Sequence, residues 1–143
     1  MKELAAVKSK INQLPLEDQK EMLDLLLELE NAKEKEASRE DFLTFVRKMW
    51  PAFIAGKHHE IMADAFERVA NGDLKRLIIN MPPRHTKSEF ASFLFPAWFL
   101  GRYPEKKIIQ TAHTAELAVG FGRKVRNLIG QEDFQQVFPG IEL

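Results

Sequence analysis

The stretch from Leu77 to Ser88 constrains the fold of this chain most, because its character changes twice within a few residues. Leu77-Ile78-Ile79 is a short apolar run suited to a buried parallel strand. A loop stiffened by two prolines follows, and Lys87-Ser88 then opens an amphipathic segment that can form a helix. The order of strand, loop, Lys-Ser and helix is typical of a P-loop, which cradles phosphate groups.

The chemistry of phosphate binding explains this order. Phosphate oxygens need backbone N–H groups and a helix N-terminus, an ammonium group for the β/γ oxygens, and a hydroxyl for Mg²⁺. Lys87 and Ser88 fit the last two roles. The usual pattern has two glycines, where this chain has Met81 and Thr86, and a Lys-Ser pair alone is equally typical of a solvated helix start. Because a β-branched residue resists positive φ, we expect Thr86 to have negative φ.

Composition sets only broad limits. With 143 residues, 45% of them hydrophobic, the chain is expected to be one small domain or a fragment of a larger one, with a packed core. Its formal net charge of zero does not by itself favour nucleic-acid binding. It has no cysteine, no apolar signal core and no long apolar run. We therefore expect a soluble, intracellular protein that does not enter a membrane.

The N-terminal segment is expected to be helical. Residues 2–13 are weakly amphipathic, and Pro15 starts a stronger helix in which Met22, Leu25 and Leu29 share a face. This helix can form a hairpin packed on its own domain, or it can dock on another subunit. The charged run from Asn31 to Glu36 is predicted to be a hinge.

The remaining elements follow from caps and periodicity. A capping-box variant from Ser38 to Asp41 predicts a helix that ends at Trp50-Pro51, and Asn71-Gly72 is expected to end the next one. Pro96 should kink the helix after the loop or start a new turn in it. The other expected elements are helix 58–70, helix 87–100, strand 107–112 and a helix capped by Thr114. Together they predict a β-α-β unit.

The amino-acid sequence of the central stretch is similar to that of a known family. Arg76 to Glu89, with Met81-Pro82-Pro83-Arg84-His85-Thr86-Lys87-Ser88 inside it, closely resembles the ATPase start of the large terminase subunit of tailed bacteriophages. That family usually has Pro-Pro-Arg-His-Gly-Lys-Ser, so Thr86 departs from it. The resemblance covers most of residues 39–143, through Trp50-Pro51, His58-His59, Ile108 to Ala118, Phe121 to Arg126 and Phe138-Pro139-Gly140.

This resemblance implies an α/β fold, with N-terminal helices followed by the first β-α-β unit of an incomplete P-loop NTPase sheet. It implies an N-terminal helical segment (1–37), a helical linker on the adenine side (38–73) and the start of the ATPase core (74–143). ATP and Mg²⁺ are the implied cofactors, with Lys87 and Arg84 catalytic and Ser88 on the metal. The residues expected to bind the nucleotide are Pro82, Pro83, Arg84, His85, Thr86, Lys87 and Ser88.

The implied function is ATP hydrolysis that drives DNA into a procapsid. The implied partners are double-stranded DNA, the portal, the small terminase subunit and further copies in a ring, in the cytoplasm of an infected bacterial host. No strand ending in paired carboxylates follows Ser88, so we expect this chain to be the N-terminal part of such a protein and inactive alone. A nuclease domain would lie further on. Two alternatives are a helicase-like motor and a non-catalytic module with a degenerate loop.

Several other residues invite a functional interpretation. His58 and His59 diverge on a helix, which disfavours a shared metal ion. The resemblance implies that one of them, or the loop from Phe53 to Gly56, contacts adenine. We expect Arg123, Lys124 and Arg126 either to form a solvated face or to make a contact, with DNA phosphates or with the next subunit of a ring. Thr111 and His113 follow the second expected strand and can couple the nucleotide to DNA.

Overall fold

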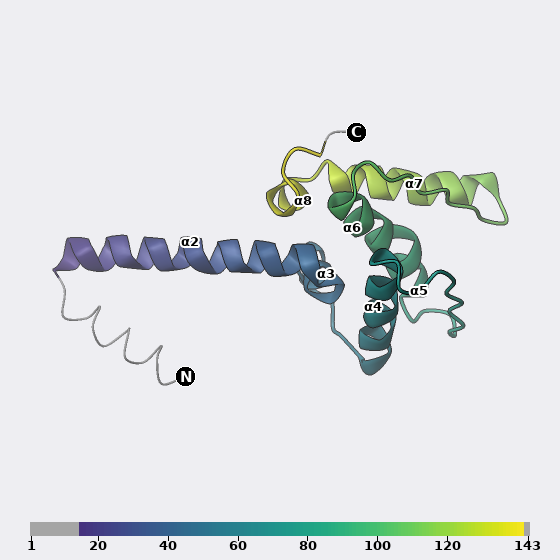
Figure 1. Ribbon diagram of the computed structural model, residues 1–143, viewed down its shortest axis with the longest axis horizontal. Coiled ribbons are helices and arrows are strands. Elements are labelled where there is room, and N and C mark those ends of the chain that lie inside the picture. Colours follow the sequence, from purple (N-terminus) through teal and green to yellow (C-terminus); the bar gives the residue numbers. More distant parts are fainter. Residues whose placement is uncertain (1–14, 142–143) are drawn as a thin grey trace. The chain divides into compact units, whose positions relative to one another are not determined.

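The computed structural model describes residues 15–141, and every regular element in that range is a helix (Figure 1). The chain divides into two compact units, residues 1–35 and 36–143. None of the described helices is both long and apolar enough to cross a lipid bilayer. The helices are α2 (Leu16–Glu40), α3 (Phe42–Met49), α4 (Lys57–Ala70), α5 (Lys87–Glu89), the π-helix η1 (Phe90–Leu94), α6 (Phe95–Arg102), α7 (Ala115–Ile129) and α8 (Glu132–Val137).

The first unit contains most of α2. The apolar face predicted there is open to solvent, with Leu25 50% and Leu29 56% exposed. The hinge predicted at Asn31 to Glu36 is wrong, because α2 continues through this run to Glu40. Lysine, glutamate and alanine dominate the run, and all three are strong helix formers. Residues 2–13, the other arm of the predicted hairpin, lie outside the described residues, so both interpretations of this helix stay predictions.

An aromatic cluster forms the core of the second unit. Phe42 is fully buried, and its ring meets those of Phe66, Phe90 and Phe95 edge-on, with centroids 5.6 to 5.9 Å apart. Edge-to-face contacts of this kind add to the stabilisation that burial gives. Trp98 completes the cluster, and its indole N–H donates to the carbonyl of Ser38 at 3.1 Å. Four helices therefore meet around the side chain of Phe42.

The boundaries of α3 are set by capping groups. Asp41 is the N-cap and its side chain accepts from the N–H of Thr44, so the helix begins later than the predicted box at Ser38, which lies inside α2. The carboxylate of Glu67, on α4, accepts from the N–H of Phe42 at 2.8 Å. The helix ends at Met49, before Trp50-Pro51, as predicted.

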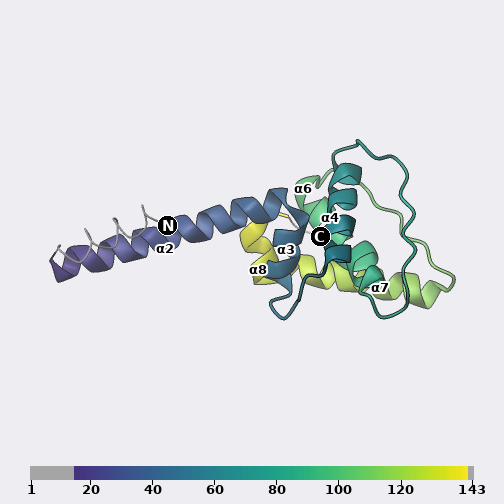
Figure 2. The same cartoon turned by 90° about the horizontal axis from the view of Figure 1, so that it is seen from below.

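The predicted β-α-β unit is wrong, because no strand is present among residues 15–141 (Figure 2). Residues 76–82 and 107–112 are extended, but neither segment makes a backbone hydrogen bond to another described residue. Ile78 is 86% exposed and Ile109 is 90% exposed. A strand exists only where a neighbouring strand pairs with its backbone, and apolar β-branched residues alone do not supply that neighbour.

The helix after the loop is interrupted as its proline predicts. Phe90–Leu94 form a turn of π-helix, and Pro96 lies in the first turn of α6. In an α-helix the carbonyl of Ser92 would accept from the N–H of residue 96, which proline lacks. Instead, the side-chain amide of Gln110 donates to the Ser92 carbonyl at 2.9 Å. This bond ties the extended segment 107–112 to the helical layer.

Candidate phosphate-binding site

The loop predicted to bind phosphate surrounds a hollow. Residues Met81 to Glu89 line a cavity of about 470 Å³, so all of the predicted nucleotide-binding residues lie around one space. The extended segment 76–82 leads into the loop, and α5 leaves it at Lys87. The order of segments therefore matches that of a P-loop, with an unpaired extended segment in place of the strand.

The backbone of this loop is left-handed at two non-glycine residues. Arg84 has φ 64° and Thr86 has φ 58°, so the prediction of negative φ at Thr86 is wrong. A non-glycine residue in this region costs about 1–3 kcal/mol, and β-branched residues are the least suited to it. Left-handed residues in tight loops let successive N–H groups converge on an anion. The left-handed conformation of Arg84 and Thr86 is therefore compatible with a loop that turns backbone N–H groups toward an anion.

Several backbone donors of the loop are free. The N–H groups of Arg84 and Thr86 make no hydrogen bond to another described residue. The N–H groups in the first turn of a helix have no partner within the helix, which adds those that begin at Lys87. His85 is turned back on the loop, since its Nδ1 lies 2.9 Å from the carbonyl of Pro83. The loop therefore presents backbone donors and keeps one of its side chains for internal bonding.

The charged and hydroxyl groups complete the set of donors. Lys87 is half-buried and Arg84 is exposed, and neither forms an ion pair with another described residue. Ser88 is exposed and offers one hydroxyl oxygen. Glu89, the one carboxylate that lines the hollow, is paired with Lys124 at 3.0 Å. Two cations and free N–H groups fit phosphate oxygens, and a single hydroxyl fits a Mg²⁺ ion whose other ligands are phosphate and water.

A histidine on α4 reaches this loop. Nε2 of His59 lies 2.6 Å from Oγ1 of Thr86, and that hydroxyl donates to the carbonyl of His85 at 2.7 Å. His59 is 6% exposed, and burial, followed by the nearby His58 and His85, lowers its pKa. The sequence disfavoured a metal site at His59 and gave no sign of a bond to Thr86, because the two residues lie on separate elements.

The histidines do not form a recognisable metal site. The rings of His58 and His59 have centroids 3.8 Å apart, and His85 lies 5.9 Å from His58. Over residues 15–141, no group of three or more His, Cys, Asp or Glu side chains is arranged to hold a metal ion. The nearby rings therefore help to lower the pKa of His59, but they do not form a set of metal ligands.

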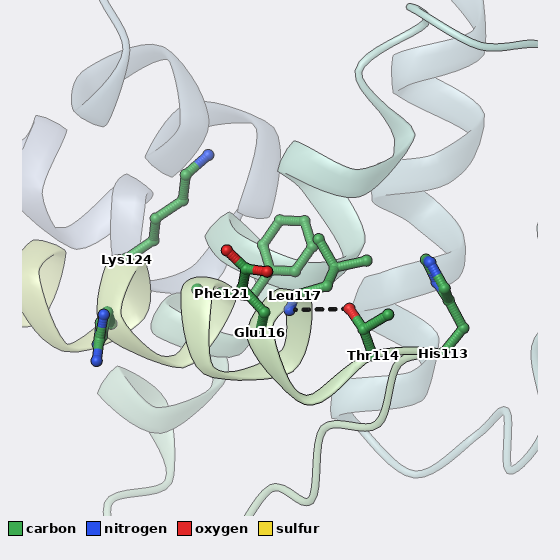
Figure 3. Close-up of a pocket in the computed structure, with 8 residues that line it drawn as sticks. His113, Thr114, Glu116, Leu117, Phe121 and Lys124 are labelled. Carbon is green, nitrogen blue, oxygen red and sulfur yellow. Dashed lines mark hydrogen bonds between the residues drawn. The ribbon is translucent and has the colours of Figure 1, made fainter.

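None of the other candidate residues lines the loop hollow. A cavity of about 570 Å³ lies along α7 and is lined by His113, Thr114, Phe121 and Lys124 among others (Figure 3). The hydroxyl of Thr114 accepts from the N–H of Leu117 at 3.3 Å, which confirms the predicted cap. The ammonium of Lys124 is bonded to Glu89 and lies 5.6 Å from the centroid of the Phe121 ring.

The remaining basic and polar candidates are on the surface. Arg123 and Arg126 are exposed on α7, as either of their two interpretations requires. Thr111 lines a further hollow of about 480 Å³, together with Ile109. Neither Thr111 nor His113 lines the hollow of the phosphate-binding loop, so a direct coupling of these two residues to the nucleotide stays a prediction.

In comparisons with known proteins, no family model, no curated protein and no solved structure matches the chain. The resemblance to the large terminase subunit is therefore a prediction from motifs. Support for a function comes from the loop itself, through the donors that surround its hollow.

Proposed function

We propose that residues 81–88 bind the phosphate groups of ATP together with Mg²⁺. The observation that carries this proposal is that one hollow of about 470 Å³ is lined by Lys87, by Arg84 and by Thr86, and that the N–H groups of Arg84 and Thr86 have no described partner. Cationic and N–H donors around a concave surface are the chemistry that recognises phosphate. The order of residues before and after the hollow, from Leu77 to Ser88, supports the same conclusion.

Each side chain has a distinct part in this proposal. The ammonium of Lys87 stabilises charge on the β- and γ-phosphates, and Arg84 adds a second positive charge at the exposed rim. The hydroxyl of Ser88 holds Mg²⁺, which neutralises phosphate charge when it is bound. In the wider proposal the protein belongs to an ATP-driven DNA-packaging motor. Double-stranded DNA, the portal and the small terminase subunit are then its partners.

A second candidate is a module that binds nucleotide without hydrolysing it. It is favoured by the carboxylate that lines the hollow, Glu89, because the ion pair with Lys124 occupies its charge. Hydrolysis requires an acid that positions water, and transition-state stabilisation is lost when such groups are missing. We therefore expect Mg·ATP binding by these 143 residues and no hydrolysis above background, with or without DNA.

Substitution of Lys87 tests phosphate binding. Lys87→Ala removes a charge-assisted contact worth about 1.5–3 kcal/mol, so Mg·ATP should bind at least about tenfold more weakly by isothermal titration calorimetry. Lys107→Ala is the matched control, because this exposed lysine lines a different hollow. Circular dichroism should show an unchanged fold for both. Equal affinity of wild type and Lys87→Ala would contradict the proposal.

The metal has a separate test. Ser88→Ala should weaken binding of Mg·ATP and leave binding of ATP in EDTA unchanged, because the hydroxyl acts through the ion. An equal loss under both conditions would show that Ser88 contacts phosphate directly.

A further inference from the structure

The loop of residues 81–88 is held from one side by a buried histidine. His59 projects from α4, and its Nε2 lies 2.6 Å from Oγ1 of Thr86. Its ring packs against that of Phe53, with centroids 4.8 Å apart, and against that of Phe90, at 5.0 Å. These contacts fix the plane of the imidazole. The residue thus joins the first turn of α4 to the residue that precedes Lys87.

The hydrogen-bond directions in this bridge can be assigned. The N–H of Gly56 donates to Nδ1 of His59 at 2.9 Å, so Nδ1 carries a lone pair and Nε2 carries the proton. Nε2 therefore donates to the hydroxyl of Thr86, whose own hydrogen goes to the carbonyl of His85 at 2.7 Å. Each donor in this series of three hydrogen bonds has an acceptor. We call the series, which runs from Gly56 through His59 and Thr86 to His85, the His59 bridge.

The bridge reaches a residue whose backbone conformation is unfavourable. Thr86 has φ 58°, a conformation that glycine adopts freely and that a β-branched residue resists. Both bonds of its hydroxyl are satisfied only while the side chain stays between His59 and the His85 carbonyl. Without the bridge, negative φ would be favoured at Thr86. The N–H groups of Thr86 and Lys87 would then leave their present directions.

We propose that His59 is a positioning residue, which holds Thr86 in its left-handed conformation and thereby keeps the loop in the shape that phosphate requires. This inference rests on the proposed function for its purpose, but its mechanical part does not involve nucleotide. His59 takes the place of the conformational freedom that a glycine at residue 86 would supply. Two predictions separate this role from a general contribution to stability. Glutamine at residue 59 should replace histidine, and alanine at residue 59 should no longer weaken binding when residue 86 is glycine.

The first experiment measures Mg·ATP affinity by calorimetry. His59→Ala should weaken binding roughly 2- to 10-fold, the range expected for one hydrogen bond. His59→Gln should restore most of it, because the amide nitrogen of glutamine can reach the Nε2 position and donate to Thr86. Ile61→Ala is the control, since Ile61 lies on the same helix as His59 and its side chain is 63% exposed. It should bind as wild type does.

The decisive arm uses Thr86→Gly. Glycine adopts positive φ without help, so adding His59→Ala to Thr86→Gly should leave affinity unchanged. The same two substitutions should be coupled in the midpoint of urea unfolding, which requires no nucleotide. Equal weakening by His59→Ala with threonine and with glycine at residue 86, or additive shifts in the urea midpoint, would overturn the proposal. If wild type binds no Mg·ATP and the midpoints are still coupled, the proposed function fails and the bridge stands.

Discussion

The aromatic core and the two extended segments use the same kind of residue with opposite results. Phe42 is fully buried among helices, whereas Ile109 is 90% exposed on the segment 107–112. A helix satisfies its own backbone, so packing one apolar face is enough to complete it. An extended segment needs a neighbour for its N–H and C=O groups before its side chains can be buried on both sides.

The segment 76–82 shows this difference residue by residue. Leu77 and Ile79 are half-buried and pack against the core, while Ile78 between them is 86% exposed. The alternation is that of a strand, but the ladder is missing, because no described residue bonds to this backbone. Side-chain periodicity and backbone pairing are therefore separate properties, and the first does not ensure the second.

The largest expected contrast is in amide hydrogen exchange. The N–H groups of Ile78 and Ile109 lack hydrogen bonds to described residues, so they should exchange nearly as fast as in an unfolded peptide. Amides in α3 and α4, which are opened only by unfolding, should exchange slower by at least about a thousandfold. NMR or mass spectrometry can measure both sets in one sample. Strong protection at Ile78 would show that this segment is paired in solution.

The next prediction concerns side-chain burial. Phe42→Ala removes a fully buried ring from the centre of the cluster and should destabilise the second unit by about 3–5 kcal/mol in urea unfolding. Ile109→Ala is the matched control and should change stability by less than about 0.5 kcal/mol. A large loss from Ile109→Ala would mean that this side chain is covered.

A smaller loss of stability is expected where Phe138 packs against α6. A Cβ at Gly101 would lie 2.5 Å from Cδ2 of Phe138, whose side chain is itself buried. Gly101→Ala should therefore destabilise the protein by about 1–3 kcal/mol through overpacking. Gly120→Ala on α7 meets no atom within 4 Å and should be neutral or slightly stabilising, because alanine favours helix. Thermal unfolding of the two variants measures both effects. The midpoint temperature should fall for Gly101→Ala and should be unchanged or slightly higher for Gly120→Ala.

The cap on α3 should give an effect of about 1 kcal/mol. Glu67→Ala removes the acceptor for the N–H of Phe42 and should cost about that much, whereas Glu67→Gln keeps an acceptor. Burial raises the pKa of Glu67 above its usual 4.5, despite the bond from Phe42, which lowers it. Its contribution to stability is therefore complete below pH 4.5 and is lost as the pH rises through the folded-state pKa. The free energy of unfolding of Glu67→Gln should thus be higher than that of wild type at pH 7. The difference between the two should decrease as the pH is lowered and Glu67 of wild type becomes protonated.

The smallest prediction concerns the surface of α7. Lys124→Ala breaks the 3.0 Å pair with Glu89 and should cost at most about 1 kcal/mol, since both side chains are partly solvated. The loss should shrink in high salt. Arg123→Ala, one residue away on an exposed position, is the control and should have no measurable effect. A larger loss than this for Lys124→Ala would point to the contacts with Phe93 and Phe121.

Much of the helical framework could be predicted from the sequence. The end of α3 before Trp50-Pro51, the cap at Thr114 and the interruption at Pro96 are confirmed, because each depends on the chemistry of one or two neighbouring residues. The stop at Asn71-Gly72 is confirmed for the same reason, with Gly72 at φ +85°. The sequence also predicted that residues 82–88 lie around one site, because these residues are contiguous. Whether this site binds ATP stays a prediction.

Two of the features that were mispredicted depend on residues distant in sequence. The β-α-β unit failed because strands require partners, and the left-handed backbone of Thr86 is accompanied by a bond from His59, 27 residues away. The sequence by itself determined where α3 and α4 end and where α7 begins, since these boundaries follow from local backbone sterics and capping. The tertiary structure decided which extended segments are paired, which histidine meets the loop and which conformation Thr86 adopts. These outcomes depend on contacts between elements, and their free energies exceed the local preferences of the residues involved.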